Sequence, residues 1–492
     1  MRIAAGLAAL GGFIALSYEI CWIRAYSFLG AGAAYVFGVF LGSYLAGLAL
    51  GAYVARRACA GPRSGRPLVA LALYLFLANL AGFLLVPLVA AATPWLHGLL
   101  RNDGALFAAT QLPVVVAGAL LGTALPLIAH FGIEPDERAG PRIGWLYLGN
   151  ILGSAAGSLL TGYVLMDVWP LRGIALFLAL LGLAMAGGVL MLSPIRPWRA
   201  FGGLAAAGVL AVLVAPGAYD GVYERLLFKS DYDGARFRRV IENKSGVICV
   251  THDDRVYGGG AYDGGFNTDP HLDSNGIRRA YAIAALHPAP RDILVVGLGS
   301  GSWAQVVANH PAAESVVVVE INPGYLDLAR GEPEVKSLLE NPKVTIVVDD
   351  GRRWLRRTDR RFDAIVQNTT HHWRGHVTNL VSREYLELCR AHLKPGGVFY
   401  TNTTQSDEVL RTGAVTFPHA WRFRSFLAVS DAPFAPDKDR WIAALEAWRI
   451  DGAPVTTRPQ ELVDEPFEDR ASILERTKGA TVITDDNMAS EY

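Results

Sequence analysis

The sequence has few cysteines and no excess of charge of either sign. Its four cysteines (Cys21, Cys59, Cys249 and Cys389) stand apart, and none belongs to a Cys-x-x-Cys pair. This spacing argues against a disulfide framework and against a zinc site. The chain carries 45 basic and 45 acidic residues, so its formal net charge is zero. A nucleic-acid-binding protein usually shows a basic excess, and we therefore expect no nucleic-acid partner.

Charge is scarce in the first half of the chain. Residues 1–218 carry almost none outside short connecting segments, whereas 219–492 have the composition of an ordinary globular protein. Apolar runs of about 18 residues or more are candidates for membrane-spanning helices. The sequence predicts seven of them, at 3–27, 31–55, 68–93, 104–131, 144–168, 170–193 and 200–218. The first lacks a small-residue cleavage site and is followed at once by others, so we interpret it as a span rather than a signal peptide.

Small residues recur at helix-face spacing within two of these runs. The second run contains Gly38, Gly42, Gly47 and Gly51, and the fifth contains Gly149, Gly153 and Gly157 with Ser154 and Ser158. Because small residues allow helices to approach closely in lipid, this pattern favours a packed bundle over seven separate anchors.

Four polar side chains lie inside the apolar runs, where such groups are costly and often functional: Glu19, Asn79, Gln111 and Asn150. Glu19 precedes Arg24 by five residues, which favours an intramembrane or interfacial ion pair. A polar pathway or a head-group site within the bundle is the alternative that the sequence leaves open.

The globular half contains a glycine-rich turn between two apolar runs. Residues 292–296 form the first run, the glycines Gly297, Gly299 and Gly301 follow, and the run 315–320 ends in Glu320. In such a β-α-β unit the glycines let a nucleotide approach the backbone, and the acid accepts hydrogen bonds from ribose hydroxyls. A strand-to-helix turn in a plain α/β domain is the structural alternative.

The spacing of the glycines narrows the ligand class. Gly-x-Gly-x-Gly differs from the Gly-x-Gly-x-x-Gly of dinucleotide sites, and no Lys-Ser/Thr pair follows, which excludes a P-loop. A nucleoside without a pyrophosphate fits best, so we expect S-adenosylmethionine or a relative.

Strand and helix patterns alternate after residue 292. The sequence predicts strands at 293–297, 315–320, 344–348, 362–367 and 397–402, and helices at 302–309, 323–330, 351–357 and 382–393. This alternation is typical of a mostly parallel sheet covered on both faces, with ligands at the carboxyl ends of the strands. Polar clusters follow those ends, at Gly297–Gly301, Glu320, Asp349-Asp350-Gly351 and 368–376.

The segment ahead of this unit has a different character. Residues 219–291 contain short β-type runs, a glycine-rich stretch at 257–269 and a helical pattern at 274–286. We expect a small antiparallel β-subdomain that leads into a mobile glycine-rich loop.

Together these motifs resemble the spermidine synthase (polyamine aminopropyltransferase) family over roughly residues 235–430. The shared elements are Tyr262-Asp-Gly264, His287-Pro288, the turn at 293–301, Val319-Glu320, Asp349-Asp350-Gly351, Phe362-Asp363 and Leu393-Lys-Pro-Gly-Gly397. The apolar half is similar to that of bacterial proteins in which such a domain is fused to a transporter-like bundle. The resemblance implies that Glu320 binds the ribose, that Asp350 binds the adenine amino group and that Gly297–Gly301 hold the rest of the nucleoside. Asn267 stands where the family has a glutamine near the nucleotide.

The chain departs from the family at the position of its catalytic acid. Where the family has Asp-Ser-Ser-Asp, this chain has Asn368-Thr369-Thr370-His371, and a carboxamide accepts no proton at neutral pH. Residues 275–277 are Asn-Gly-Ile, where the family has a Tyr-His-Glu run in its acceptor-binding helix. Two supports for a cationic polyamine are therefore missing.

The histidines that follow Asn368 offer replacement chemistry. His371, His372 and His376 lie within six residues, beside Trp373 and Arg374. We expect one histidine, His371 first, to act as general base, Arg374 to hold an anionic group and Trp373 to cover a cation. His372 and His376 at i, i+4 also suit a metal, but no cysteine or second carboxylate cluster accompanies them, and we predict no metal site. Histidines that merely shape the pocket are the structural alternative.

The sequence thus predicts a multi-span helical bundle (1–218), a small β-subdomain (219–291), a Rossmann-like S-adenosylmethionine-dependent transferase domain (292–430) and a C-terminal helix and tail (431–492). The terminal run 482–491 either folds back on the sheet edge or frays. The leading hypothesis is an enzyme that uses S-adenosylmethionine or its decarboxylated form to alkylate, with an aminopropyl or methyl group, an amine-bearing or lipid-soluble acceptor. A nucleotide-binding transporter or sensor without turnover, and cleavage or cyclisation of the cofactor without an acceptor, are the alternatives.

The predicted location is a bacterial inner membrane, with membrane lipid as a partner and a homodimer as one option for the assembly. Arginines after the second, fourth and sixth runs favour a cytoplasmic N-terminus, which with seven spans places the globular half outside. S-adenosyl nucleotides are made in the cytosol, however, and the last run fits an interfacial or re-entrant segment. On cofactor supply we expect a cytoplasmic globular half.

Overall fold

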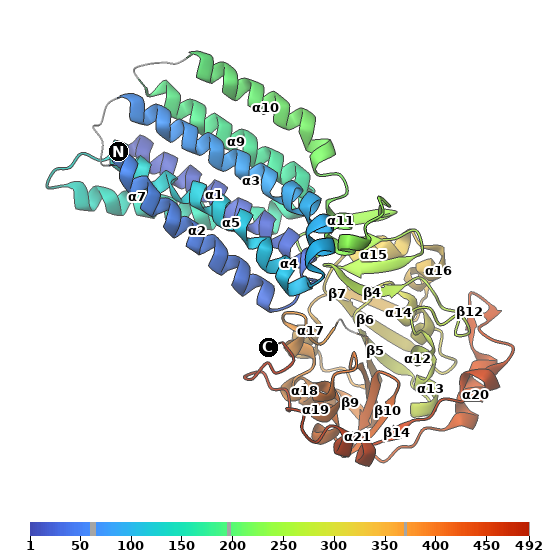
Figure 1. Ribbon diagram of the computed structural model, residues 1–492. Helices are drawn as coiled ribbons and strands as arrows, with labels where there is room; N and C mark the ends of the chain where they lie inside the picture. The colour runs from blue at the N-terminus through green and yellow to red at the C-terminus, as the bar shows by residue number, and fades with distance from the viewer. Residues whose placement is uncertain (60–64, 194–197, 369–370, 492) are drawn as a thin grey trace. The chain divides into compact units, whose positions relative to one another are not determined.

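The computed structural model describes the chain except residues 60–64, 194–197, 369–370 and 492 (Figure 1). The chain forms two compact units. Unit 1 comprises Met1–Arg236 with Glu242–Gly246, and unit 2 comprises Phe237–Ile241 with Val247–Tyr492.

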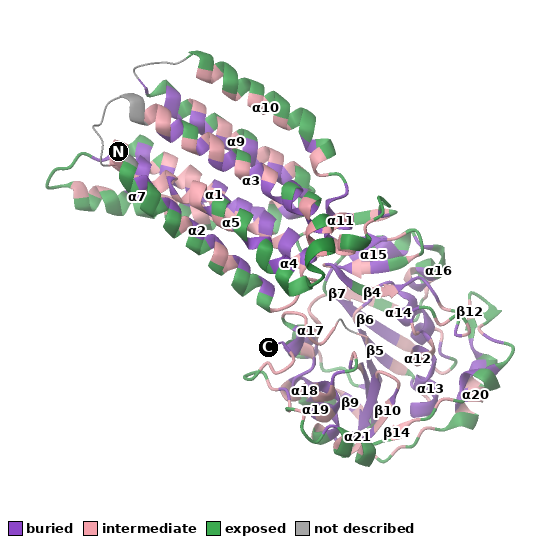
Figure 2. Ribbon diagram, viewed as in Figure 1, coloured by how far each residue is buried: buried purple, intermediate pink, exposed green. Residues whose placement is uncertain are grey.

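Unit 1 is helical. Its elements are α1 (Arg2–Leu29), α2 (Tyr35–Cys59), α3 (Gly65–Leu100), α4 (Asp103–Ala109), α5 (Gln111–Gly122), α6 (Ala124–Gly132), α7 (Ala139–Leu160), η1 (Thr161–Leu165), α8 (Met166–Val168), α9 (Leu171–Met191), α10 (Trp198–Ala218), α11 (Val222–Phe228) and η2 (Lys229–Asp231). Seven helical stretches among the described residues are long and apolar enough to cross a membrane, and each overlaps one of the seven predicted spans. Large apolar side chains on α2, α7 and α10 stay exposed, among them Phe37, Ile151 and Leu213 (Figure 2). Such faces suit lipid contact.

Glycines bring pairs of these helices together. A Cβ added at Gly149, Gly153 or Gly157 of α7 would collide with the carbonyl oxygens of α1 at Ala5, Ala9 and Phe13. Gly47 and Gly51 of α2 abut the backbone of α5 in the same way, whereas Gly38 and Gly42 have no neighbour within 4 Å. The predicted packing role is therefore confirmed for five of these seven glycines and wrong for Gly38 and Gly42.

The polar side chains inside the spans are bonded within the bundle. The amide nitrogens of Asn79, Gln111 and Asn150 donate to the carbonyls of Leu75, Phe107 and Ala8.

The expected ion pair between Glu19 and Arg24 is absent from the described residues. Arg24 donates instead to the carbonyl of Asn243, at 2.6 Å. Five helical positions turn the side chains about 140° apart, which explains the difference.

Most of a four-stranded antiparallel sheet belongs to unit 2. Its strands are β1 (Arg239–Asn243), β2 (Gly246–Val250), β3 (Arg255–Gly258) and β4 (Ala261–Gly265), and Glu242–Gly246 at the turn from β1 to β2 belong to unit 1. The predicted β-subdomain is thus present, but the stretch expected as a glycine-rich loop is largely the β3–β4 hairpin. Gly259 and Gly260 make its turn with φ of 55° and 85°, so the glycines serve a tight turn. The helix expected at 274–286 is two short helices, α12 (Arg278–Tyr281) and α13 (Ile283–Leu286).

The rest of unit 2 is a Rossmann-like domain. Its elements are β5 (Asp292–Val296), α14 (Ser302–Ala308), β6 (Ser315–Glu320), α15 (Gly324–Arg330), α16 (Pro333–Lys336), η3 (Ser337–Glu340), β7 (Val344–Val348), α17 (Gly351–Leu355), β8 (Phe362–Gln367), η4 (Val377–Leu380), α18 (Arg383–Ala391), β9 (Leu393–Asn402), α19 (Asp407–Thr416), β10 (His419–Phe423), β11 (Phe426–Ser430), α20 (Lys438–Ala447), β12 (Arg449–Ile450), β13 (Ala453–Pro454), η5 (Pro459–Leu462), β14 (Glu468–Asp469) and α21 (Arg470–Arg476).

Eight strands form one sheet in the order β14-β10-β11-β9-β8-β5-β6-β7. Strands β9, β8, β5, β6 and β7 run parallel, and β11, β10 and β14 are antiparallel to their neighbours. Alternate residues of β5 enter two hydrophobic clusters, Ile293 and Val295 one, Leu294 and Val296 the other. Both faces of the sheet are therefore covered, as predicted.

The C-terminal run folds back on this domain. Ile483 is buried and its carbonyl accepts from the backbone N–H of Arg383 at the start of α18. Asp485 forms an ion pair with Arg352 of α17, and Glu491 accepts from the backbone N–H groups of His376 and Thr378. The tail thus folds back on the domain, the first of the two predicted alternatives, and does not fray. Its carboxylates bind a cationic side chain and backbone N–H groups there.

Candidate functional site

The glycine turn between β5 and α14 has a backbone that favours glycine. Gly297, Gly299 and Gly301 have φ of 90°, 54° and 86°, which other residues adopt only with strain. A Cβ at Gly299 would come 3.1 Å from the carbonyl oxygen of Asp263. A side chain at Gly299 would therefore crowd the backbone of Asp263.

Glu320 ends β6 directly beside this turn. One carboxylate oxygen accepts from the backbone N–H of Leu298 at 2.7 Å, and the other from that of Asn322 at 2.8 Å. The side chain is buried, and burial raises its pKa while the two N–H groups oppose that shift. Its carboxylate is thus fixed at the carboxyl edge of the sheet, beside the glycine turn.

The two acids after β7 both contact Arg353, but in different ways. Asp350 caps α17 by accepting from the backbone N–H of Arg353 at 2.7 Å, a common N-cap contact. Asp349 forms an ion pair with the Arg353 side chain and accepts from the backbone N–H of Asp350. A Cβ at Gly351 would come 2.7 Å from Val296, so this glycine lets α17 approach β5. The assignment of these three residues to the adenine side stays a prediction.

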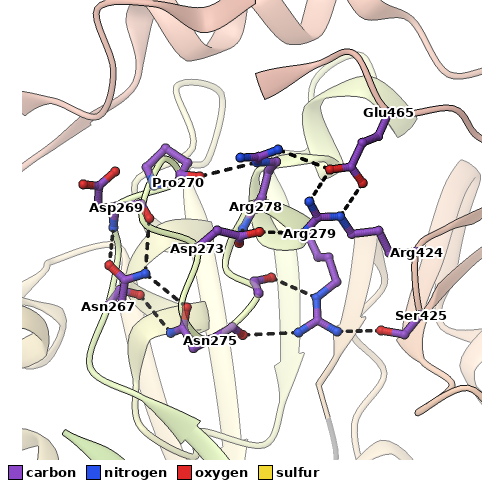
Figure 3. A network of polar contacts seen from close by, with 11 residues as sticks. Asn267, Asp269, Pro270, Asp273, Asn275, Arg278, Arg279, Arg424, Ser425 and Glu465 are labelled. Carbon is purple, nitrogen blue, oxygen red and sulfur yellow. Dashed lines mark hydrogen bonds and ion pairs between the residues drawn. The ribbon is translucent and has the colours of Figure 1, made fainter. Parts of the chain in front are cut away.

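Asn267 lies in a polar network that fixes the loop between β4 and α12 (Figure 3). Its side chain bonds Asp269 and Asn275, and Asn275 in turn donates to the carbonyls of Gly265 and Asn267. Farther along, Arg424 pairs with Asp273 and Glu465. The backbone N–H of Asn267 donates to Ser302 of α14, which places the loop beside the glycine turn. Direct contact of Asn267 with a nucleotide remains a prediction.

Asn368, which stands where the resembled family has its catalytic aspartate, lies at the carboxyl end of β8. The side-chain oxygen of Asn368 accepts from Asn402 at the end of β9, at 3.0 Å. The backbone oxygen of Asn368 lies 3.6 Å from where a Cβ of Gly297 would stand, so Asn368 borders the glycine turn. Thr369 and Thr370 lie outside the described residues.

His371 lies three residues after Asn368, in the segment that follows β8. Its ring stacks on Trp373 at 5.1 Å between centroids. Burial lowers the pKa of His371, the Asp263 carboxylate opposes that shift, and Arg374 adds to it. A half-buried imidazole with a lowered pKa is neutral at pH 7 and therefore able to accept a proton.

Asp263 and Tyr325 join the site although the sequence analysis gave neither a role. The Tyr325 hydroxyl donates to Asp263, and Arg374 lies 3.6 Å from the other carboxylate oxygen. Burial raises the pKa of Asp263, and Arg374 and Tyr325 counteract it. The Tyr262-Asp-Gly264 motif contained the signal, but only the fold brings the β4 residue Asp263 against Arg374.

The other two histidines face elsewhere. His372 forms a hydrogen bond between Nδ1 and the Thr404 hydroxyl at 2.8 Å. His376 has φ of 69° and precedes η4, so the two do not share a helical face. Among the described residues no group of three or more His, Cys, Asp or Glu side chains is placed to hold a metal ion.

Comparison with known proteins gives a family match within unit 2. Residues 282–414 match the family model described as spermine/spermidine synthase domain. Spermidine synthase of Dictyostelium discoideum is 36% identical over 113 residues, 23% of this chain and 39% of that protein. Polyamine aminopropyltransferase 1 of Pseudomonas aeruginosa is 31% identical over 136 residues, 26% of this chain and 47% of that protein. The chain thus spans less than half the length of these curated relatives.

Solved structures of the same class are more distant. A spermidine synthase in complex with the transition state analogue AdoDATO has a TM-score of 0.37 and 18% identity, covering 50% of this chain and 87% of that one. Spermidine synthase from Thermotoga maritima has a TM-score of 0.36 and 18% identity, covering 50% and 90%. Residues 282–414 of this chain are thus similar to the spermine/spermidine synthase family, as its motifs predict.

Proposed function

We propose that this chain is a membrane-embedded transferase that uses an S-adenosyl nucleotide to alkylate an amine-bearing or lipid-soluble acceptor. The observation that carries the proposal is the meeting of two groups of residues at one sheet edge. Gly297–Gly301 and Glu320 suit a nucleoside, and His371 beside Asp263 suits proton removal. Seven helical stretches that are long and apolar enough to cross a membrane support the location.

The residues of the turn fit a nucleoside. A side chain at Gly297, Gly299 or Gly301 would strain the backbone, and glycine there keeps side chains out of the turn. Glu320 keeps acceptor capacity beyond its two backbone bonds, because each ionised carboxylate oxygen accepts two hydrogen bonds. In this proposal Glu320 holds the ribose hydroxyls, and Asp349–Gly351 line the adenine side.

The chemistry follows from what the β8 side offers. When bound, the nucleotide supplies a carbon activated by an adjacent sulfonium. An amine acceptor arrives mostly protonated at neutral pH, so transfer requires a group that takes up its proton. His371 Nδ1 or Nε2 takes that role because Asn368 cannot, and Asp263 stabilises the imidazolium that results. Trp373, stacked on His371, excludes water from one side of the ring.

Turnover separates this proposal from its alternatives. The purified full-length chain, incubated with S-adenosylmethionine or its decarboxylated form and a panel of amines and membrane lipids, should form many product molecules per enzyme by mass spectrometry. Tight nucleotide binding without product would favour a transporter or sensor. Nucleotide fragments formed in the absence of any acceptor would favour cleavage or cyclisation.

A further inference from the structure

Two opposite charges lie side by side at the glycine turn. Arg374 Nη1 and Asp263 Oδ1 are 3.6 Å apart, and 20% and 16% of the two side chains are exposed. Asp263 belongs to β4, whereas Arg374 belongs to the segment after β8. Both groups are thus partly shielded from water, which strengthens their electrostatic effect on a ligand that reaches them.

Contacts around Asp263 and Arg374 indicate which part of a bound nucleotide would lie near them. The backbone of Asp263 borders Gly299, and Gly264 borders the Ser300 hydroxyl at 3.3 Å from a Cβ position. The order of the strands is β8-β5-β6-β7. With the ribose at Glu320 on β6 and the adenine towards β7, the sulfur and its tail extend towards β8. The pair therefore lies where the tail of the nucleotide ends.

We propose that Asp263 and Arg374 bind the zwitterionic tail of intact S-adenosylmethionine, and that the chain selects this donor over the decarboxylated form. The inference rests on the proposed nucleoside site. The intact tail carries an ammonium, which matches Asp263, and a carboxylate, which matches Arg374. The decarboxylated tail carries only the ammonium, so it can pair with Asp263 but offers no carboxylate to Arg374.

The donor limits the group that is transferred. Intact S-adenosylmethionine delivers either its methyl or its aminocarboxypropyl group. In both cases the carbon–sulfur bond breaks, its electron pair stays on sulfur, and the acceptor nitrogen forms the new bond to carbon. The proton that the nitrogen loses goes to His371. The transferred group therefore differs from the aminopropyl group of the decarboxylated donor.

Three thioethers that differ only in the tail test this inference by calorimetry on the purified full-length chain. They are 5′-methylthioadenosine, S-adenosyl-3-thiopropylamine and S-adenosylhomocysteine, which add no charge, an ammonium, and an ammonium with a carboxylate. We expect S-adenosylhomocysteine to bind roughly 10- to 100-fold more tightly than S-adenosyl-3-thiopropylamine, as for a charge-assisted contact.

Variants of Arg374 test whether this residue causes the difference in affinity between the two ligands. Arg374→Gln should bring this ratio close to one while 5′-methylthioadenosine binds as in the wild type, which also shows that the variant folds. Arg374→Lys should keep part of the ratio because it keeps the charge. Arg360→Gln is the matched control, since Arg360 lies ahead of β8, at the opposite end of that strand, and bonds Ser315.

The outcomes that overturn the inference are distinct. Equal or tighter binding of S-adenosyl-3-thiopropylamine by the wild type, or an unchanged ratio in Arg374→Gln, refutes the selection for a carboxylate but leaves the nucleoside site standing. A wild type that binds none of the three ligands refutes the nucleoside site itself, and with it the inference.

Discussion

The carboxyl edge of the sheet has two sides that differ in what forms them. The proposed nucleoside side, Gly297–Gly301 with Glu320 and Asp349–Gly351, relies on backbone conformation and on carboxylates held by backbone N–H groups. The proposed reaction side, Asn368, His371 and Arg374 with Asp263, relies on side chains that contact one another across two sheets.

This difference separates what the domain binds from what it does. A site formed by backbone groups changes little when single side chains change, so the nucleoside side keeps its family pattern. The reaction side depends on the identity of each side chain, and here an amide and an imidazole stand where the family has two carboxylates. Family membership therefore predicts the nucleotide class better than the reaction.

The largest effect should come from His371, because it tests the reaction side alone. In His371→Gln we expect turnover to fall by about 10²–10⁴-fold, the usual scale for loss of a general base. Nucleotide affinity should stay nearly constant, since Glu320 and the glycine turn are untouched. Steady-state kinetics with mass-spectrometric product detection and calorimetry measure the two quantities.

His252→Gln provides the control, since His252 is exposed in the turn between β2 and β3. Wild-type turnover in His371→Gln would contradict the assignment of the base. Positioning of an already neutral acceptor, which suffices for some methyl transfers, would then be the better account.

A smaller effect is expected on the nucleoside side. Glu320→Ala should weaken S-adenosyl nucleotide binding by about 1.5–3 kcal/mol, the range for hydrogen bonds to a charged group. Calorimetry measures the change, and Glu314→Ala is the control because exposed Glu314 lies just before β6, at the other end of the same strand, and pairs with Arg291. Unchanged affinity in folded Glu320→Ala would show that the nucleoside binds elsewhere.

The sequence predicted the five parallel strands of the sheet, which local patterns determine, but not β10, β11 and β14. The bounds of β6, β7 and β8 agree with those expected, since each is a run of β-branched and apolar residues between polar turns. Strand β9 starts four residues earlier than predicted, at Leu393, because pairing with Phe362 of β8 extends it across Pro395 and two glycines. The β3–β4 hairpin was missed for the same reason, since cross-strand pairing is not a local property.

The sequence predicted the backbone features of the candidate site better than the contacts between its side chains. The glycine turn and Glu320 follow from spacing along one β-α-β unit. Asp263 and Tyr325, by contrast, come from β4 and α15, and only folding brings them to Arg374. The expected pairing of Glu19 with Arg24 failed because spacing in sequence says little about partners outside the helix.

The smallest expected effect is a shift in the pH dependence of the activity. It tests whether the charges near His371 set the pKa of the base on the reaction side. Burial lowers the pKa of His371 below its usual value of 6.5, so its neutral, proton-accepting form persists to lower pH. A base with an unshifted pKa would keep about a quarter of its activity at pH 6. We expect the chain to keep more than that fraction of its plateau kcat/KM there.

Two variants should move this acid limb in opposite directions. Asp263→Asn removes a carboxylate that favours the imidazolium, so the midpoint should fall further; Arg374→Gln removes a cation that disfavours it, so the midpoint should rise. The profiles are measured at saturating donor, because both residues are proposed to bind its tail. If neither substitution shifts the acid limb, the titrating base is not influenced by the charges of Asp263 and Arg374. That result would contradict the assignment of His371 as the general base.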